Sequence, residues 1–138
     1  LDGSANDNLR RVIVWAVETG MRASEIASLT DVQGNVAVIY DSKNGTGRRV
    51  PLSKKALSVW DGGFGLTAGS ISAEFAKLTK KCGITGLTFH DLRHSACTRL
   101  SKLLNPYELS KMMGHKDLNM VLRVYYSQDA EDTAKKLG

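Results

Sequence analysis

The chain has 138 residues, a length that predicts a single domain. Lysine and arginine outnumber aspartate and glutamate by 19 to 14, for a formal net charge of +5. This charge suits a polyanionic partner and is equally ordinary for a protein surface. The sequence has no apolar run of about 18 residues, which argues against a membrane-spanning helix. Its two cysteines lack the spacing of a disulfide framework or a metal site, so we expect reduced thiols in a cytosolic protein. The start at Leu1, without a signal region, suggests a fragment of a longer chain.

An amphipathic helix is predicted over residues 6–19, where apolar residues recur at helical spacing and Gly20 supplies a stop. The apolar stripe consists of Leu9, Val12, Ile13, Ala16 and Val17, and the expected exposed face carries Arg10 and Arg11. A second short helix, about Ala23–Ser28, should begin at once, which puts Arg22 at the elbow between the two. Free backbone N–H groups at that helix start would join the Arg22 charge in attracting an anion. Arg22 could equally form an ordinary salt bridge with Glu25, three residues on.

A β-hairpin is predicted from residues 36–40 and 48–52, because β-branched residues flank a glycine-rich turn at Asn44-Gly45. Lys43 is expected at the end of the first strand, beside this turn. A lysine in such a position often only protects an edge strand. Its functional interpretation therefore depends on the residues gathered around it.

The second half of the chain is predicted to be helical, apart from a glycine-rich loop over residues 61–69. Helices are expected over residues 53–60, 70–82, 90–103, 105–113, 117–125 and 129–138. Their expected buried residues are Ile71, Phe75, Leu78, Cys82, Leu92, Ala96, Leu100, Leu103, Leu118, Val121, Leu122 and Tyr125. The expected caps are Thr88, the Asn105-Pro106 start and Asp117. These elements predict an α+β fold that is mainly α-helical, with a small antiparallel β-hairpin or sheet at one edge.

Six side chains have the chemistry to gather around a phosphodiester. They are Arg22, Lys43, His90, Arg93, His115 and Tyr125. Arginine clamps phosphate oxygens, histidine donates or shuttles a proton, and tyrosine can be a covalent nucleophile. Each also has a structural explanation, since helical tyrosines usually belong to the core and a histidine after a helix-stopping glycine often caps carbonyls. Their joint occurrence in one order favours the phosphodiester site.

This order resembles the catalytic domain of the tyrosine recombinase (phage integrase) family over nearly the whole chain, from about residue 9 to 126. The matching motifs are the first arginine box at 19–26, the lysine hairpin at 43–52, the His-x-x-Arg box at 90–95 and the second histidine box at 113–118. Any one motif is weak, and all four in order before a late tyrosine are a strong match. The resemblance implies that residues 1–138 are the catalytic domain and that the N-terminal core-binding domain is absent from this chain.

The resemblance implies a site-specific recombinase or integrase that cleaves and rejoins DNA strands through a 3′-phosphotyrosyl intermediate. No metal, other cofactor or nucleotide triphosphate is implied. The implied partners are double-stranded DNA, further copies of the protein in a tetramer on DNA, and accessory DNA-bending or directionality proteins. We expect no membrane association and a site of action in the bacterial cytoplasm or nucleoid, including as a phage protein acting there.

The resemblance also implies a role for each side chain. Tyr125 is the implied nucleophile, and His90 would position or deprotonate its phenol. Arg22, Arg93 and His115 would donate to the transition state. Lys43 is the implied acid that protonates the leaving 5′-oxygen. The carboxylates of Glu25 and Asp91 are expected to orient these cations, because a two-metal site needs several clustered carboxylates.

Alternatives exist for the nucleophile and for the function. In many family members the tyrosine follows the second histidine by nine residues, where this chain has Val124. A subset with a spacing of ten favours Tyr125, with Tyr126 as the second candidate. The first alternative function is a recombinase-like module that binds DNA but has lost cleavage. The second is a metal-free phosphate-ester hydrolase with His90 as its nucleophile.

Overall fold

The structure, a computed structural model, describes residues 4–40, 47–114, 118–126 and 130–138. This part of the chain forms eight helices and three strands. The helices are α1 (Ser4–Thr19), α2 (Ala23–Ser28), α3 (Lys54–Ser58), α4 (Ala68–Lys81), α5 (Asp91–Leu100), α6 (Pro106–Met113), α7 (Leu118–Tyr126) and α8 (Ala130–Leu137). The strands are β1 (Val32–Gln33), β2 (Val36–Ile39) and β3 (Arg48–Pro51). The predicted α+β fold, mainly α-helical with a small antiparallel sheet, is confirmed. None of the helices in the described ranges is both long and apolar enough to cross a membrane.

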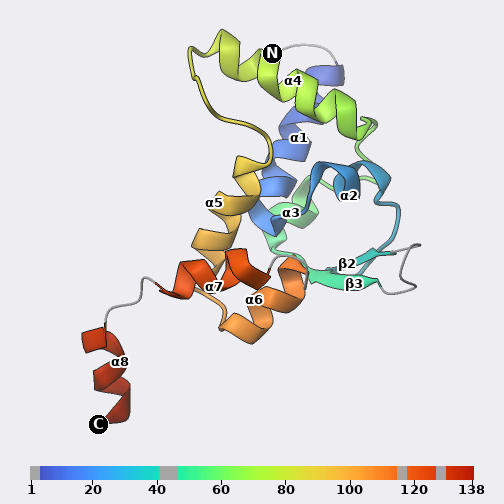
Figure 1. The fold of residues 1–138 in the computed structure, drawn as a ribbon. Helices are drawn as coiled ribbons and strands as arrows, with labels where there is room; N and C mark the ends of the chain where they lie inside the picture. Colours follow the sequence, from blue (N-terminus) through green and yellow to red (C-terminus); the bar gives the residue numbers. More distant parts are fainter. Residues whose placement is uncertain (1–3, 41–46, 115–117, 127–129) are drawn as a thin grey trace.

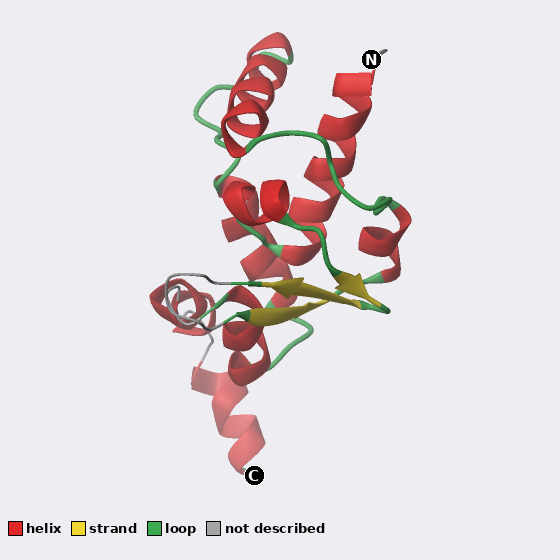
Figure 2. Cartoon of the chain, turned by 90° about the vertical axis from the view of Figure 1, so that its right-hand side faces the viewer, coloured by secondary structure: helices red, strands yellow, loops and turns green. Residues whose placement is uncertain are grey.

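Helix α1 is the centre of the fold, and α2, α3, α4 and α5 all pack against it (Figure 1). The sheet lies at one side of the helices, where β3 packs against α6 (Figure 2). Helix α7 packs on α5 and α6, and α5 also contacts α6, so α5, α6 and α7 form one connected group. Helix α8 lies apart from the rest of the molecule (Figure 1).

The sheet has the order β1-β2-β3, and both pairs are antiparallel. Ala37 pairs with Val50, and both are fully buried, so one face of the hairpin belongs to the core. Strand β1 was not predicted, because it has only two residues and pairs only through Val32 and Gln33. The predicted turn at Asn44-Gly45 lies outside the described residues.

Trp15 fills the middle of the core, with its ring centroid 5.6 Å from that of Trp60 and 5.4 Å from that of Phe64. Arg11, one turn earlier on α1, was expected to be exposed, and that prediction was wrong. Its Nε donates to the Val59 carbonyl at 2.9 Å, and its Nη2 donates to the Gly63 carbonyl at 2.8 Å. A buried guanidinium needs acceptors of this kind, so Arg11 holds the loop after α3 against α1.

Four residues predicted to be buried are exposed, and each lies at a helix end or on the flank of a helix. They are Cys82, Leu103, Leu118 and Leu122. Helices α4 and α5 end before Cys82 and Leu103, so those side chains leave the helical periodicity. Helix α7 buries the row that contains Val121, and the neighbouring leucines remain in solvent.

Gly20 links α1 to α2 through a left-handed backbone conformation, with φ of +71°. A Cβ atom at this position would lie 2.8 Å from the Met113 side chain, which is fully buried. Glycine is therefore favoured both by the backbone angle and by the close approach of α6.

We predict that Gly20→Ala lowers the free energy of unfolding by about 1 kcal/mol more than Gly34→Ala. Both positions have positive φ, so alanine costs roughly 1–2 kcal/mol at either. Of these two glycines, only Gly20 has a neighbour within 4 Å of the added Cβ. Overpacking at such a position costs about a further 1–3 kcal/mol of stability. Urea denaturation of the two variants measures the difference, and equal losses would contradict the close packing of Gly20 on Met113.

Candidate functional site

A cavity of about 510 Å³ brings together three of the six predicted site residues, Arg22, His90 and Arg93. Its walls come from the start of α2, the first half of α4 and the start of α5. Apolar residues form part of the wall, among them Met21, Phe75 and Phe89. Two guanidinium groups and an imidazole thus border one cavity, which can receive an anion.

Arg93 is almost completely buried, with 2% of its surface exposed. Its Nη1 donates to the Gly20 carbonyl and its Nη2 to the Met113 carbonyl, both at 2.5 Å. One side chain therefore joins α5 to the turn before Arg22 and to the last residue of α6. Bonds from a charged donor to carbonyls are strong, and they fix the guanidinium plane at the edge of the cavity.

Arg22 precedes α2 and is about a third exposed. Its backbone N–H donates to Glu25 Oε1 at 2.9 Å, and its Nη1 lies 3.5 Å from Glu25 Oε2. The salt bridge that the sequence suggested as an ordinary explanation is present, and so is the expected orientation of Arg22 by Glu25. The two interpretations are compatible, because one carboxylate holds both the backbone and the side chain of Arg22.

Arg48 on β3 is a second partner of Glu25, and sequence reasoning missed it. Its Nη2 donates to Glu25 Oε1 at 2.9 Å, and its Nη1 donates to Oε2. Burial disfavours the Glu25 carboxylate, but the hydrogen bonds and positive charges of Arg48 and Arg22 outweigh that effect and lower the pKa of Glu25. The sequence did contain a signal for a buried arginine, namely two adjacent arginines, Arg48 and Arg49, in a predicted strand. Successive side chains of a strand point to opposite faces, so one of the two must point inward.

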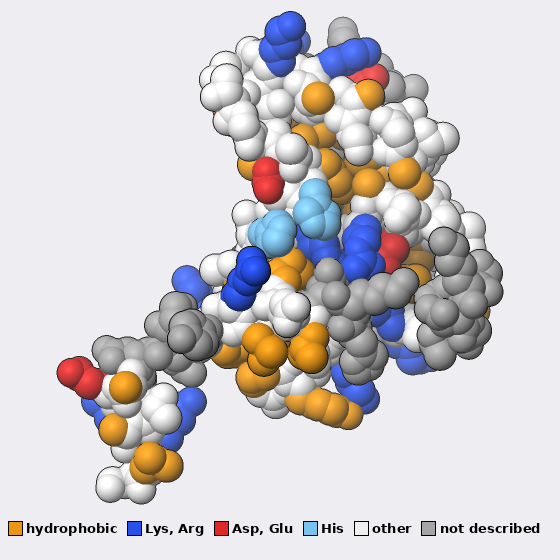
Figure 3. All heavy atoms as spheres, viewed as in Figure 1, with side chains coloured by type: hydrophobic (Ala, Val, Ile, Leu, Met, Phe, Trp, Pro, Cys, Tyr) orange, Lys and Arg blue, Asp and Glu red, His pale blue; other side chains and the backbone are white. Residues whose placement is uncertain are grey.

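His90 precedes α5 and is exposed at the rim of the cavity. Its ring lies edge-on to that of His94, with the centroids 5.2 Å apart. The face drawn in Figure 3 shows the described histidine side chains near lysine or arginine side chains and acidic side chains, at the waist of the molecule. A proton acceptor or donor is thus available at the entrance.

Asp91 acts on the turn before α5. Thr88 donates to Asp91 Oδ2 from its backbone N–H at 2.8 Å and from its hydroxyl at 3.1 Å. These hydrogen bonds lower the pKa of Asp91. The predicted cap by Thr88 is wrong, because α5 has no side-chain cap hydrogen bond and the Thr88 hydroxyl donates to Asp91 instead. In the structure Asp91 holds the turn at Thr88, and the orienting role expected from the sequence stays a prediction.

Tyr125 lies on α7 and does not line the cavity of Arg22 and Arg93. Its hydroxyl donates to the Leu104 carbonyl at 2.5 Å, and its ring packs against the core. Burial, followed by the nearby Cys97 and Glu108, raises the pKa of Tyr125. The phenol is thus held by the loop that joins α5 to α6 in this structure.

Lys43, His115 and the side chain of Tyr126 lie outside the described residues, so their predicted roles stay predictions. Helix α6 ends at Met113, and its C-cap residue, Gly114, directly precedes His115. Within the described part of the chain, no group of three histidine, cysteine, aspartate or glutamate side chains is placed to hold a metal ion.

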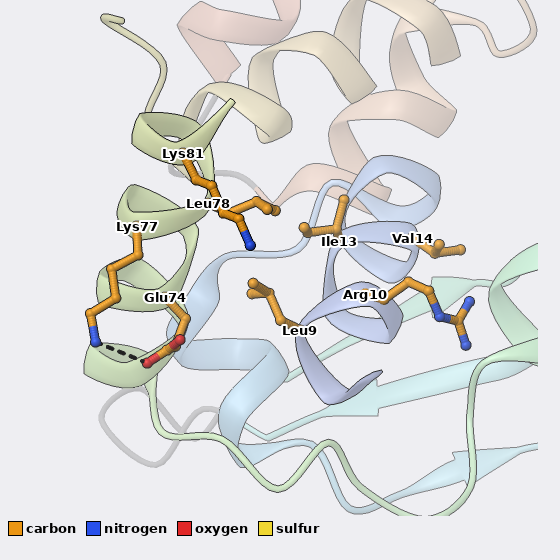
Figure 4. Close-up of a pocket in the computed structure, with 8 residues that line it drawn as sticks. All are labelled: Leu9, Arg10, Ile13, Val14, Glu74, Lys77, Leu78 and Lys81. Atoms are coloured by element: carbon orange, nitrogen blue, oxygen red, sulfur yellow. Dashed lines mark ion pairs between the residues drawn. The ribbon is translucent and has the colours of Figure 1, made fainter. Parts of the chain in front are cut away.

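A second cavity, of about 300 Å³, lies between α1 and α4 (Figure 4). Leu9, Ile13 and Leu78 point toward the gap between the helices, while Lys77 turns away from it to pair with Glu74 at 3.5 Å. Of the predicted site residues that the structure describes, none lines this cavity. It is an apolar cleft with a charged rim.

The sequence profile of the phage integrase family matches residues 3–61 and 64–132. The chain belongs to the phage integrase family. It is 38% identical over 139 residues to a Haemophilus influenzae protein named as an integrase/recombinase, covering 91% of this chain and 46% of that protein. It is 35% identical over 132 residues to the shufflon-specific DNA recombinase of Escherichia coli, covering 84% of this chain and 34% of that protein. This family member thus spans a third to a half of the relatives it matches.

Two solved integrases have the same fold as this phage integrase family member. The Tn1549 transposon integrase in complex with a circular intermediate DNA superposes with a TM-score of 0.76 at 22% identity, covering 92% of this chain and 57% of the other. A lambda integrase dimer bound to a COC′ core site superposes with a TM-score of 0.71 at 21% identity, covering 85% and 51%. At these identities the likeness establishes the fold, and the predicted family resemblance is confirmed.

We expect the free energy of unfolding of this protein to fall as the pH is lowered from about 5 to 3. We predict that this decrease is smaller in Glu25→Gln. The pKa of Glu25 lies below its ordinary value of 4.5 in the folded protein. The folded state therefore favours the carboxylate, and this stabilisation is present above the ordinary pKa and is lost as the pH falls. Urea denaturation across that pH range measures it.

Glu74→Gln on α4 is the matched control, because it removes a carboxylate that pairs with the exposed Lys77. We expect the control to leave the pH dependence closer to that of the wild type. Identical profiles for Glu25→Gln and Glu74→Gln would mean that the Glu25–Arg48 pairing contributes nothing to stability.

Proposed function

We propose that this chain, residues 1–138, is the catalytic domain of a site-specific DNA recombinase that cleaves and rejoins strands through a covalent tyrosine–phosphate bond. The observation that carries the proposal is that Arg22, His90 and Arg93, from separate segments of the chain, border one cavity. A pair of guanidinium groups is suited to the nonbridging oxygens of a phosphodiester. Family membership supports DNA as the source of that phosphodiester.

In the proposed reaction, the Tyr125 phenol oxygen attacks the scissile phosphorus. The bond from phosphorus to the 5′-oxygen breaks, and Lys43 gives that oxygen a proton, while His90 accepts the phenolic proton. The products are a 3′-phosphotyrosyl bond and a free 5′-hydroxyl. One phosphodiester replaces another, so no external energy source is needed. The 5′-hydroxyl of a partner strand then attacks the phosphotyrosyl phosphorus, which releases Tyr125 and rejoins the DNA.

Arg22 and Arg93 have different parts in this proposal. Arg93 is held by two backbone carbonyls, so its orientation is set before substrate arrives. Arg22 is more exposed, and Glu25 orients it at the mouth of the same cavity. Donors fixed in advance lose little energy to reorganisation when charge develops on the phosphate oxygens. His115 would add a third hydrogen-bond donor to the phosphate oxygens. This role is inferred from the second histidine box alone.

The proposal requires the Tyr125 hydroxyl to leave the Leu104 carbonyl before attack. Breaking one such hydrogen bond costs about 0.5–1.5 kcal/mol net, which is small beside the free energy of DNA binding. The raised pKa of Tyr125 applies to the resting position, where the phenol is a poor nucleophile. Movement to the cavity would put the phenol beside His90 and two guanidinium groups.

The position of Tyr125 also favours a second candidate function, a DNA-binding module without cleavage. In that case Tyr125 is a core residue, and Val124 stands where many family members have the nucleophile. The cavity would then hold a backbone phosphate without breaking it.

We propose that the functional form is an assembly of several copies on double-stranded DNA, up to a tetramer on paired sites. A lambda integrase of the same fold has been solved as a dimer on DNA. Helix α8 lies apart from the body, and its Leu137 is 83% exposed. A neighbouring copy, or this copy's own body, would supply the surface that α8 needs.

We predict that the chain forms a covalent adduct, stable in SDS, with nicked duplex DNA, and that Tyr125→Phe abolishes it. The nick lets the short 5′-hydroxyl strand diffuse away, so the phosphotyrosyl intermediate accumulates. A pool of nicked duplexes with random sequence is the probe, and gel mobility in SDS is the measurement.

Tyr126→Phe is the matched control for Tyr125→Phe, because it removes the neighbouring phenol and nothing else. Loss of the adduct only in Tyr126→Phe would move the nucleophile by one residue. DNA binding without any adduct from the wild type would favour the binding module. Turnover of a small aryl phosphate that survives Tyr125→Phe would favour the hydrolase.

We predict that DNA affinity falls about 10²-fold or more between 50 and 200 mM salt, with little sequence selectivity. Contacts to phosphates release counterions, so the logarithm of affinity falls steeply with that of salt concentration. Arg22→Ala should reduce the slope by about 1. Arg10→Ala, on the rim of the other cavity, should leave it unchanged. Fluorescence anisotropy gives both slopes, and a shallow slope for the wild type would contradict the phosphate footprint.

A further inference from the structure

Arg48, outside the six predicted site residues, connects segments that are remote in sequence. It comes from β3, and only 17% of its side chain is exposed. Both terminal nitrogens donate to the Glu25 carboxylate on α2, while Nε donates to the Met112 carbonyl at 3.0 Å. It also packs against Gly114, whose missing Cβ would lie 3.5 Å from Nη1. Arg48 therefore connects the sheet to two helices at once.

Arg48 and Arg93 form two bridges between the same two segments. Arg93 joins the Gly20 carbonyl to the Met113 carbonyl. Arg48 joins Glu25 to the Met112 carbonyl, one residue away. The segment from Gly20 to Glu25, which contains Arg22, is thus tied at both ends to the last turn of α6.

The charge of Arg48 matters as much as its geometry. The Glu25 carboxylate lies 3.5 Å from Arg22 Nη1, so it opposes the positive potential that Arg22 offers to an anion. Arg48 shares both carboxylate oxygens and supplies a compensating positive charge. If Arg48 were lost, Glu25 would bind Arg22 more tightly and draw it from the cavity.

We propose that Arg48 is a positioning residue for phosphate binding by Arg22. It holds Glu25, and through Glu25 it sets where the Arg22 guanidinium lies relative to Arg93 and the end of α6. The inference rests on the proposed function, because it assigns the cavity a phosphodiester. Arg48 does not line the cavity, so its effect on the reaction passes through Glu25 and Arg22.

Arg49 provides a matched control on the same strand. It neighbours Arg48 in sequence, is exposed, and pairs with Val38 in the sheet register. Successive side chains of a strand point to opposite faces. Arg49→Ala therefore removes the same charge from the same strand without touching Glu25 or α6.

The experiment measures single-turnover adduct formation at saturating protein, with the nicked duplex that the wild type captures best from the random pool. DNA affinity is measured separately by anisotropy. We expect Arg48→Ala to slow adduct formation by about 10-fold or more, since losing a direct oxyanion donor costs about 10²–10³-fold. Arg48→Lys should be intermediate, because it keeps the charge but cannot reach both oxygens and a carbonyl. Arg49→Ala should keep the wild-type rate.

A double variant distinguishes positioning from general destabilisation. If Arg48 acts by restraining Glu25, adding Glu25→Gln to Arg48→Ala removes the uncompensated carboxylate and restores part of the rate. Two independent structural defects would instead add their losses. Equal rates for Arg48→Ala and Arg49→Ala, or simple additivity in the double variant, would overturn the inference. If Arg48→Ala fails to fold, the comparison of Arg48→Lys with Arg49→Lys decides it.

A readout that needs no activity separates this inference from the proposed function. The NMR signal of the Arg22 Nε–H group, assigned with Arg22→Lys, reports its hydrogen bonding and solvent exchange. We expect it to shift and to exchange at a different rate in Arg48→Lys, and to stay in place in Arg49→Lys. An unmoved signal would overturn the positioning role even in an active protein. Absence of any wild-type adduct would overturn only the proposed reaction.

Discussion

The fold of this phage integrase family member depends on one buried cation. The Arg93 guanidinium, 2% exposed, donates to the carbonyls of Gly20 and Met113. A charge at that depth is tolerated only when acceptors surround it, and loss of a partner from a buried charge typically costs about 3–5 kcal/mol. The turn after α1 and the end of α6 therefore cannot separate without exposing or stranding this charge. Arg22 lies two residues after Gly20, so the hydrogen bond from Arg93 to the Gly20 carbonyl also restrains the position of Arg22.

Sequence patterns predicted the elements whose signals are local. The bounds of α2 and α6 and the helix start at Asn105-Pro106 depend on residues within a few positions of each other, and the hairpin pairs two strands that are neighbours along the chain. Capping, helix-stopping glycines and alternation are local rules, and here they agree with the fold. The order of the motifs then sufficed to predict the family, which the comparisons confirm.

Sequence patterns failed where a side chain's environment comes from distant segments. Arg11 looked like a surface residue, because nothing near it indicates that the loop after α3 returns to offer carbonyls. Arg48 looked like one of two strand arginines, because Glu25 and Met112 are remote in sequence. Tyr125 fits its predicted helical periodicity, yet its hydroxyl bonds to the Leu104 carbonyl, which no periodicity could indicate. The structure thus brings together three of the predicted site residues, Arg22, His90 and Arg93, and the assignment of the nucleophile rests on the motif.

The detached helix α8 has a consequence for how the end of the chain folds. An isolated helix of eight residues is far below the roughly 12–15 residues at which helices become stable in water. Its helical form must therefore be induced by contact, and burying a side chain such as Leu137 contributes about 1.5–3 kcal/mol at most. So small a gain makes the ordering of this segment reversible, and concentration-dependent where a second copy supplies the surface. The fraction of chains with an ordered α8 would then rise with the number of protein surfaces on which α8 can pack.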